Sequence, residues 1–178
     1  INRIGAVVSC LIFGFSMVAL YGASAFYHYV KGTAEQIKKL RKLDHSMIYV
    51  LIAGTYTPVL LLAIGGRVGV IFTTVIWALA LFGILVKLCW LNAPRWLYTS
   101  VYLLMGWAIV FYYPALGSLE PITLGLIAGG GVSYSVGAVF YILKKPNFCR
   151  EFGFHEIFHL FILLGSALHF TAVFLLLV

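Results

Sequence analysis

Hydrophobic residues fill six long stretches of the chain, and short runs of glycine, proline or charged residues separate them. About 20 consecutive apolar residues are needed for a helix to cross the hydrocarbon core of a bilayer. Each stretch therefore predicts one membrane-spanning helix, and together they predict an all-α, polytopic transmembrane helix bundle that forms a single domain over residues 1–178. The six predicted spans are, approximately, Ile4–Tyr29, Met47–Ile64, Val68–Val86, Trp96–Leu116, Pro121–Leu143 and His155–Val178.

Two of these spans contain residues that are unusual inside a helix. Pro58 lies in the second span and is expected to kink it, because proline removes one backbone hydrogen bond; neighbouring helices can satisfy the freed carbonyl. Gly129, Gly130 and Gly131 lie in the fifth span, where glycine lets another helix approach closely. They predict a helix-packing surface rather than a phosphate-binding loop.

The composition supports a membrane protein. Of the 178 residues, 63% are hydrophobic and 10% are charged, and the mean hydropathy is +1.06. A soluble domain is about half apolar and about a quarter charged. The cysteines are Cys10, Cys89 and Cys149; they are scattered and form no C-x-x-C pair, so we expect neither a disulfide framework nor a cysteine metal site.

The basic residues predict an orientation. Ten of them lie in the connections after the first, third and fifth spans, whereas only Arg3 and Arg67 lie on the opposite side. Because basic loops stay in the cytoplasm, both ends of this chain are expected outside the cell, and a further helix is expected before Ile1, making seven spans. The ten cytoplasmic residues are Lys31, Lys38, Lys39, Arg41, Lys42, Lys87, Arg95, Lys144, Lys145 and Arg150.

This orientation also explains the net charge of +7, which therefore indicates no nucleic-acid partner. Membrane lipids are the expected partners, and the basic cluster from Lys31 to Lys42 could hold anionic headgroups. The oligomeric state is not predicted by any feature of the sequence.

Five polar residues converge at the cytoplasmic ends of the predicted spans. His28 ends the first span, and Ser24 lies one turn deeper on the same face. Asp44 opens the second span, and His155 opens the sixth with His159 one turn further in. Ionisable groups inside a membrane are costly and usually indicate function. Two imidazoles at i and i+4 can bind one ion, and three imidazoles with an open fourth position form a catalytic zinc site.

Each of these residues also has an ordinary interpretation. His28 could be an interfacial histidine, and Asp44 could be the N-cap of the second span. Ser24 could hydrogen-bond the carbonyl of Leu20 in its own helix. The combination of all five residues, with two histidines on one helix face, favours a metal site.

Residues 155–159 read His-Glu-Ile-Phe-His, which matches the H-E-x-x-H signature of zinc peptidases. The longer form of that signature fails, because Ile162 and Gly165 stand where its glycine and third histidine would be. Nor does any acidic residue follow Glu156 to act as a further ligand. Glu156 is therefore expected in the first turn of a helix, where a negative charge is favourable, rather than in the chemistry.

Two further histidines are expected to lie outside the site. His45 follows Asp44 but points about 100° away around the helix. His169 lies beyond His159 by about 15 Å along the helix, where a buried polar contact is expected.

At these residues the chain resembles the haemolysin III family, the bacterial branch of the progestin and adipoQ receptor family. The similarity extends over essentially the whole chain. It implies seven helices with a cytoplasmic N-terminus, in a bacterial inner (plasma) membrane. The matching segments are Ser24-Ala25-Phe26-Tyr27-His28, Asp44-His45, His155 to His159, Ala53-Gly54-Thr55-Tyr56-Thr57-Pro58 and Gly165-Ser166-Ala167-Leu168-His169-Phe170.

The resemblance, which extends to the alkaline ceramidases, implies that His28, His155 and His159 bind Zn²⁺ near the cytoplasmic face. Asp44 would hold or deprotonate a water at the fourth position, and Ser24 would hydrogen-bond in the site. The leading hypothesis is a zinc-dependent hydrolase of a lipid amide or ester bond. Further candidate donors to its substrate are Tyr27, Tyr49 and Tyr56.

Two other functions stay open at this point. One is a receptor-like or regulatory membrane protein with structural zinc, in which no exchangeable water is needed. The other is a pore-forming cytolysin, as the name of the family suggests, although a pore needs a continuous polar stripe and the hydroxyl residues of the spans are scattered.

Overall fold

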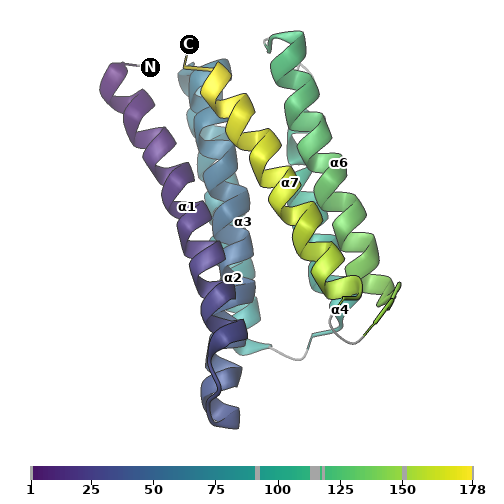
Figure 1. Cartoon of the computed structure of the whole chain (residues 1–178). Helices are drawn as coiled ribbons and strands as arrows, with labels where there is room; N and C mark the ends of the chain where they lie inside the picture. The colour runs from purple at the N-terminus through teal and green to yellow at the C-terminus, as the bar shows by residue number, and fades with distance from the viewer. Residues whose placement is uncertain (1, 91–92, 113–116, 118, 150–151, 178) are drawn as a thin grey trace. The chain divides into compact units, whose positions relative to one another are not determined.

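The computed structural model describes the chain except for residues 1, 91–92, 113–116, 118, 150–151 and 178 (Figure 1). Within those described residues, five helices are long and apolar enough to cross a membrane, and no β-strand is formed. The predicted all-α, polytopic architecture is confirmed. In chain order the helices are α1 (Arg3–Tyr29), α2 (Ala34–Pro58) with a π-helical continuation (Val59–Ile64), α3 (Gly66–Cys89), α4 (Arg95–Gly106) with a following 3₁₀ turn (Ala108–Phe111), α6 (Pro121–Leu143) and α7 (Phe154–Leu175).

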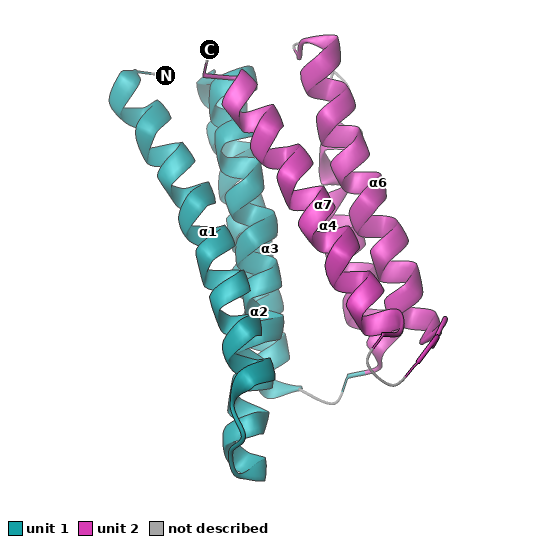
Figure 2. Cartoon of the chain, in the orientation of Figure 1, with its two compact units in different colours: residues 1–93 teal, residues 94–178 magenta. Residues whose placement is uncertain are grey.

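These helices form two compact units, residues 1–93 and residues 94–178 (Figure 2). In the first unit α1 packs along α2, and α2 packs along α3. In the second unit α6 packs along α7, and α4 packs on α6. The single domain predicted for the whole chain stays a prediction.

The helix α2 begins much earlier than the apolar pattern predicts. Its N-cap is Thr33, whose hydroxyl accepts the N–H of Gln36 at 3.3 Å, while the Gln36 side chain accepts the N–H of Thr33 at 2.8 Å. This reciprocal pair is a capping box and starts the helix at Ala34. Asp44 therefore lies well inside α2, and its interpretation as an N-cap is wrong.

Pro58, where the sequence predicts a kink, ends the regular α-helical part of α2 and is followed by π-helical turns. The π-helical turns that follow include a hydrogen bond of 2.9 Å from the N–H of Gly65 to the carbonyl of Leu60, five residues back. A proline has no N–H to donate, and a widened turn lets the chain continue across the membrane. The indole of Trp77 on α3 donates to the hydroxyl of Thr57 at 3.0 Å and fixes this distorted region against its neighbour.

The glycines of α6 form the predicted packing surface in the second unit. Gly130 lies directly against the ring of His169 on α7, so that a Cβ atom there would collide with the imidazole. At Gly131 a Cβ atom would lie 3.2 Å from the indole of Trp107. The absence of side chains at these positions therefore lets α6 approach both its neighbours closely.

Replacing Gly130 with alanine is expected to lower the free energy of unfolding by about 1–3 kcal/mol, because the new methyl group overpacks the α6–α7 interface. Gly125 is the matched control on the same helix, since a Cβ atom there meets open space. Alanine at Gly125 is expected to be neutral or to stabilise by up to about 1 kcal/mol through its higher helix propensity. Unfolding of both variants in detergent micelles, followed by circular dichroism, measures the difference. Equal stability of the two variants would contradict the packing role.

The fourth predicted span is wrong as one continuous α-helix. The helix α4 ends at Gly106, and a 3₁₀ turn follows from Ala108 to Phe111. Glycine has a low helix propensity, and the indole of Trp107 donates to the hydroxyl of Ser135 on α6 at 3.0 Å. This bond holds Trp107 outside the regular helix. The backbone N–H of Trp107 lies near the carbonyls of both Leu103 and Met105. The predicted end of this span, Leu116, lies outside the described residues.

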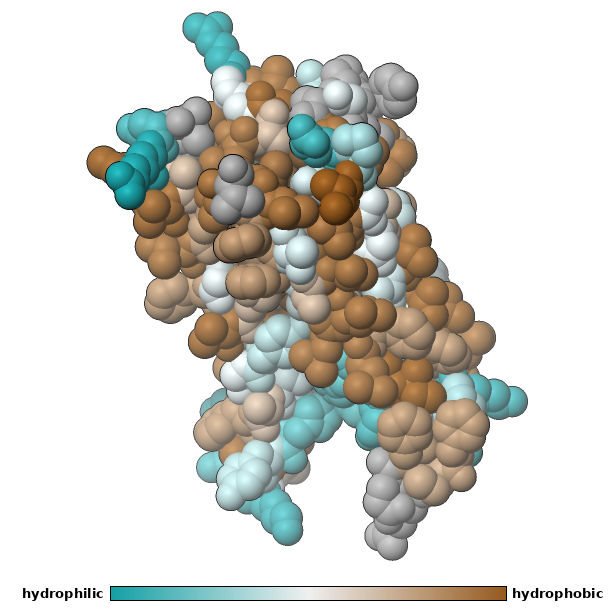
Figure 3. Space-filling view, turned by 45° about the horizontal axis from the view of Figure 1, so that its top comes forward, coloured by the Kyte–Doolittle hydropathy of each residue, from teal (hydrophilic) through white to brown (hydrophobic). Residues whose placement is uncertain are grey.

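Hydrophobic side chains cover much of the visible surface of the helices (Figure 3). Large exposed patches of this kind are unfavourable in water and are typical of a surface that contacts lipid. Strongly exposed examples on α1 and α3 are Ile4, Leu11, Phe15, Val18, Ile71, Phe82 and Leu85.

Candidate metal centre

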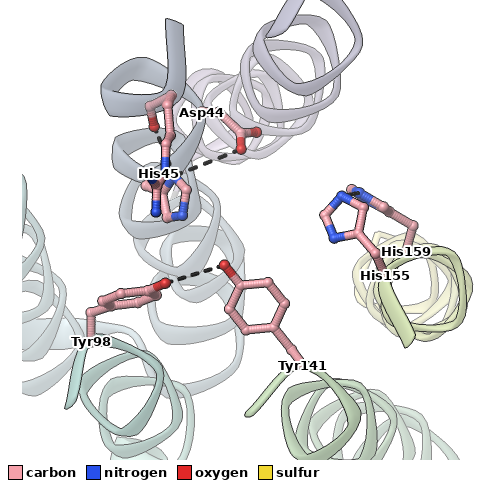
Figure 4. Close-up of polar contacts among 7 residues, drawn as sticks. Asp44, His45, Tyr98, Tyr141, His155 and His159 are labelled. Carbon is pink, nitrogen blue, oxygen red and sulfur yellow. Dashed lines mark hydrogen bonds and ion pairs between the residues drawn. The ribbon is translucent and has the colours of Figure 1, made fainter. Parts of the chain in front are cut away.

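The helix α7 begins at Phe154, so that His155 and His159 occupy its first two turns. Their Nε2 atoms lie 3.2 Å apart, and their ring planes are nearly perpendicular, at 84°. Figure 4 shows both imidazoles projecting from the same side of α7. The i, i+4 spacing thus places the two nitrogen atoms close together, as the sequence predicts.

This separation fits a shared zinc ion. Zinc binds histidine nitrogen at about 2.0–2.1 Å in a tetrahedral arrangement, which places two such nitrogens about 3.3 Å apart. The 3.2 Å between the Nε2 atoms is close to that value. A tetrahedral ion requires further ligands besides this pair.

Aromatic rings surround His155 within the second unit. Its ring centroid lies 6.2 Å from that of Phe154, 6.3 Å from that of Phe158 and 6.4 Å from that of Tyr141. These rings exclude water from part of the imidazole, which is half-buried, and lower the local dielectric constant there. Polar interactions made at this imidazole are therefore stronger than they would be in water.

In the first unit, the last turns of α1 face Asp44 on α2. The side chain of Ser24 hydrogen-bonds the Asp44 carboxyl group, and His28 interacts electrostatically with it. His28 is the penultimate residue of α1, is exposed, and has its ring centroid 4.9 Å from that of Tyr27. The structure thus brings Ser24, His28 and Asp44 together, and Asp44 is shielded, with a side-chain exposure of 16%.

The bond to Asp44 excludes two of the roles considered for Ser24. A serine hydroxyl has a single hydrogen to donate, and an ionised carboxylate can only accept. When Asp44 is ionised, Ser24 donates to it and has no hydrogen left for the carbonyl of Leu20 or for a substrate oxygen. The contact therefore makes Ser24 a residue that orients Asp44.

The neighbouring His45 is engaged elsewhere. Its Nδ1 atom donates to the carbonyl of Arg41 at 2.7 Å and lies 3.9 Å from Asp44 Oδ2 (Figure 4). This bond ties the His45 ring to its own helix.

Glu156 and His169 both have structural roles in the second unit. Glu156 Oε2 accepts the N–H of Gly153 at 2.8 Å, which confirms its expected place in the first turn of α7. His169 is buried, and its Nδ1 donates to the carbonyl of Gly165 at 2.8 Å. The ring also stacks on Tyr134, with the centroids 5.3 Å apart, so His169 serves the packing of α6 on α7.

Sequence reasoning missed a polar cluster next to His155. The hydroxyls of Tyr98 on α4 and Tyr141 on α6 are hydrogen-bonded at 3.2 Å (Figure 4). Arg95 donates to the carbonyl of Tyr141 at 3.1 Å, and its guanidinium lies 4.4 Å from the centre of the Tyr141 ring. Tyrosine and arginine are common at membrane interfaces, so no motif marks these residues.

The tyrosines that the sequence did suggest as donors lie in the first unit. Tyr49 is buried against Gly83, and Tyr56 is buried with its ring centroid 6.4 Å from that of Phe72. Both rings therefore contribute to the packing of α2 on α3, whereas Tyr27 stays beside His28.

Comparison with known proteins tests the resemblance that these residues indicate. The family described as Haemolysin-III related matches residues 2–170. The chain belongs to this family. The haemolysin III resemblance inferred from the motifs is confirmed, and with the five long apolar helices it makes this family member a multi-pass membrane protein.

Similar proteins occur in bacteria and in animals. The chain is 43% identical over 169 residues to the Hemolysin-3 homolog of Bacillus subtilis, which covers 94% of this chain and 76% of the relative. It is 39% identical over 169 residues to Hemolysin-3 of Bacillus cereus, covering 94% and 74%. The human monocyte to macrophage differentiation factor is 25% identical over 170 residues, covering 93% and 69%. The bacterial similarities extend over most of each protein.

Proposed function

We propose that this haemolysin-III-related protein is a zinc-dependent hydrolase that cleaves an amide or ester bond of a membrane lipid. The observation that carries the proposal is the 3.2 Å separation of the Nε2 atoms of His155 and His159, which matches two ligands of one tetrahedral zinc ion. Both rings also lie at the beginning of an apolar helix, where an ion-binding site would be open to lipid.

His28 is the third zinc ligand in this proposal. Three imidazoles with an open fourth position are the ligand set of a catalytic zinc site, and His28 offers a donor of the same kind as His155 and His159. Its place in the last turn of α1, just before Lys31, puts it on the basic side of the membrane together with the start of α7. Because His28 lies close to Asp44, an ion bound by His28 would have the Asp44 carboxylate beside it.

The chemistry then follows from the residues around the ion. A bound zinc ion would polarise the substrate carbonyl and lower the pKa of a water molecule beside it to about 7. Asp44, oriented by Ser24, accepts a proton from the water that attacks the carbonyl carbon. The new carbon–oxygen bond forms, the carbon–nitrogen or carbon–oxygen bond to the leaving group breaks, and Asp44 returns the proton to that group.

The proposed substrate reaches the site from the bilayer. The helices expose large hydrophobic side chains along their length, and the basic loops orient the protein in the bacterial plasma membrane with the metal centre near the cytoplasmic face. A lipid whose headgroup lies at that level presents its amide or ester bond at the depth of the first turns of α7.

The threonines favour the hydrolase over a pore. A water-filled pore needs polar groups that face its interior in a continuous stripe. The described threonine hydroxyls on α2 and α3 instead donate to carbonyls of their own helices at 2.8–2.9 Å, four residues back. They are Thr55, Thr57, Thr73 and Thr74.

The proposal predicts zinc-dependent release of fatty acid from amide-linked lipids. The purified chain in lipid nanodiscs is incubated with a panel of ceramides and other N-acyl lipids, before and after treatment with a chelator, and fatty acid is measured by mass spectrometry. Release is expected to stop on chelation and to return on addition of zinc. Release that survives complete removal of zinc contradicts the mechanism. Retention of zinc without any release supports the receptor-like alternative with structural zinc.

A further inference from the structure

We propose that the connection between α6 and α7 is a lipid anchor, in which the rings of Phe148 and Phe152 insert into the adjacent leaflet while Lys144 and Lys145 bind its anionic phosphates. This connection, the α6–α7 loop, comprises residues 144–153, and the structure describes all of them except 150–151. The anchor is a lipid-binding surface of the second unit and does not require the metal centre to be catalytic.

Two phenylalanine side chains of the α6–α7 loop are exposed next to each other. Phe148 is 71% exposed and Phe152 is 40% exposed; their ring centroids lie 6.3 Å apart, and the ring planes are inclined by 21°. Burial of one such ring in an apolar phase is favourable by about 10- to 100-fold in an equilibrium constant. An exposed pair of this kind therefore indicates a surface that contacts apolar groups rather than water.

The backbone of the loop holds the two rings side by side. The N–H groups of Phe148 and Cys149 both donate to the carbonyl of Phe152, each at 3.2 Å. Asn147 forms an isolated antiparallel bridge with Gly153, the last residue before α7. Because these bonds fix the backbone before any lipid binds, insertion of the rings costs little further conformational entropy.

The position of the loop keeps the rings at the membrane surface. The helix α6 ends at Leu143 and α7 begins at Phe154, and both helices are long and apolar enough to cross a bilayer. Figure 1 shows the loop beyond the end of α6, next to the start of α7. Exposed apolar side chains, Leu143 and Leu160, lie on the helices on either side of it. The apolar surface of the two helices thus continues into the loop, and the occupant that this continuity indicates is lipid.

The charge of the loop indicates which lipids it binds. Its sequence contains three basic residues and one acidic residue, which gives a net charge of +2. Lys144 and Lys145 are both exposed. A lysine beside an anionic leaflet strengthens binding by about fivefold, and stable attachment to a membrane commonly combines such charges with an inserted apolar group. The loop has both components, so an anionic phospholipid surface fits it best.

The anchor would also set the depth of the first turn of α7. Gly153 pairs with Asn147 in the loop, and its N–H donates to Glu156 Oε2 at 2.8 Å in that first turn. The loop is thus joined directly to the turn that carries His155. Insertion of the rings would hold this histidine at the level of lipid amide and ester bonds. Only this consequence rests on the proposed hydrolase function.

The exposed thiol of Cys149 provides a reporter between the two rings. The environment-sensitive fluorophore NBD is attached to it in a C10A/C89A background, in which no other cysteine remains. The labelled full chain is reconstituted in nanodiscs that contain phosphatidylglycerol. A blue-shifted emission is expected, together with quenching by lipids that carry a nitroxide near the headgroup end of the acyl chain.

Three variants test the residues of the anchor. F148S/F152S is expected to lose the blue shift and the quenching, because serine does not enter the acyl region. K144Q/K145Q is expected to reduce the quenching to the level measured in nanodiscs of phosphatidylcholine alone. F111S is the matched control, since Phe111 is also strongly exposed in the second unit but lies outside the loop, and it should retain the quenching. All these side chains are exposed, so the fold should persist, as circular dichroism checks.

The outcomes separate the anchor from the hydrolase. A label that is exposed to water in the otherwise unaltered loop overturns the anchor, and so does quenching that persists in F148S/F152S. Equal quenching in phosphatidylglycerol and phosphatidylcholine overturns the role of the lysines. Energy transfer between differently labelled copies in excess lipid would identify a second copy of the chain, rather than lipid, as the occupant. Fatty acid release that is unchanged in F148S/F152S overturns the link to catalysis, whereas lipid quenching in a protein that releases no fatty acid supports the anchor and contradicts only the hydrolase.

Discussion

Alanine at His155 or at His159 is expected to weaken zinc binding by more than about 100-fold, so that neither variant retains zinc through purification. Even the outer-shell partners of zinc ligands are worth about 10- to 100-fold in affinity, and each of these histidines is proposed to supply a direct ligand. The Nε2 atoms lie 3.2 Å apart, so the removal of either histidine leaves α7 with only one ligand for the ion. Elemental analysis of the purified proteins measures the loss directly.

Two variants of neighbouring residues serve as controls for this experiment. E156Q should keep its zinc, because Glu156 caps the start of α7 through Gly153. H45Q should keep it as well, because His45 is bonded to the carbonyl of Arg41. Unchanged zinc in both alanine variants would refute ligation by α7. H28A is expected to lose its zinc, as the alanine variants of His155 and His159 do. Full retention of zinc in H28A alone would show that His28 is not a ligand.

Asparagine at Asp44 is expected to leave zinc bound and to lower the rate of lipid hydrolysis by about 100- to 10,000-fold. That range is typical of the loss of a general base. Asparagine has nearly the same shape and its carbonyl oxygen can still accept from Ser24, but it cannot take a proton from water. Zinc content and the initial rate of fatty acid release, measured on the same preparation, separate the effect on binding from the effect on chemistry.

The alternative result is equally informative. Loss of zinc from D44N would make Asp44 a direct ligand, as the receptor-like protein with structural zinc requires. S24A is the companion variant, because it removes the residue that orients the carboxylate while the carboxylate itself remains. A rate for S24A below that of D44N would show that Ser24 also acts on the substrate, because a residue that acts only through Asp44 cannot cost more than the loss of Asp44 itself.

The apolar pattern predicted the middle of the helices better than their ends. It predicts α6 and the start of α7 correctly, since Pro121 and the loop before Phe154 are strong local signals. It misses the first turns of α2, which are rich in charged residues and which form because Thr33 and Gln36 cap them. It also misses the end of α4, which depends on the contact between Trp107 and Ser135 on another helix.

In the candidate site, too, contacts within one helix could be predicted from the sequence, whereas contacts between helices could not. His155 and His159 were identified from the sequence because both lie on one helix, where four residues make about one turn and place two side chains together. The contact between Ser24 and Asp44 joins two helices, and α1 approaches α2 closely because Gly54 leaves room for Ser16. No spacing rule along the chain predicts that approach.

The sequence by itself determined the class of protein, the approximate positions of the five long apolar helices, and the histidine pair, because each of these follows from local composition or from the period of a single helix. Only the tertiary structure decided that Ser24 is bound to Asp44, that His169 serves packing, and that Tyr98, Tyr141 and Arg95 form a cluster beside His155. These contacts join residues on different turns and helices. Their geometry depends on how side-chain volumes fit across an interface, which the order of residues does not reveal.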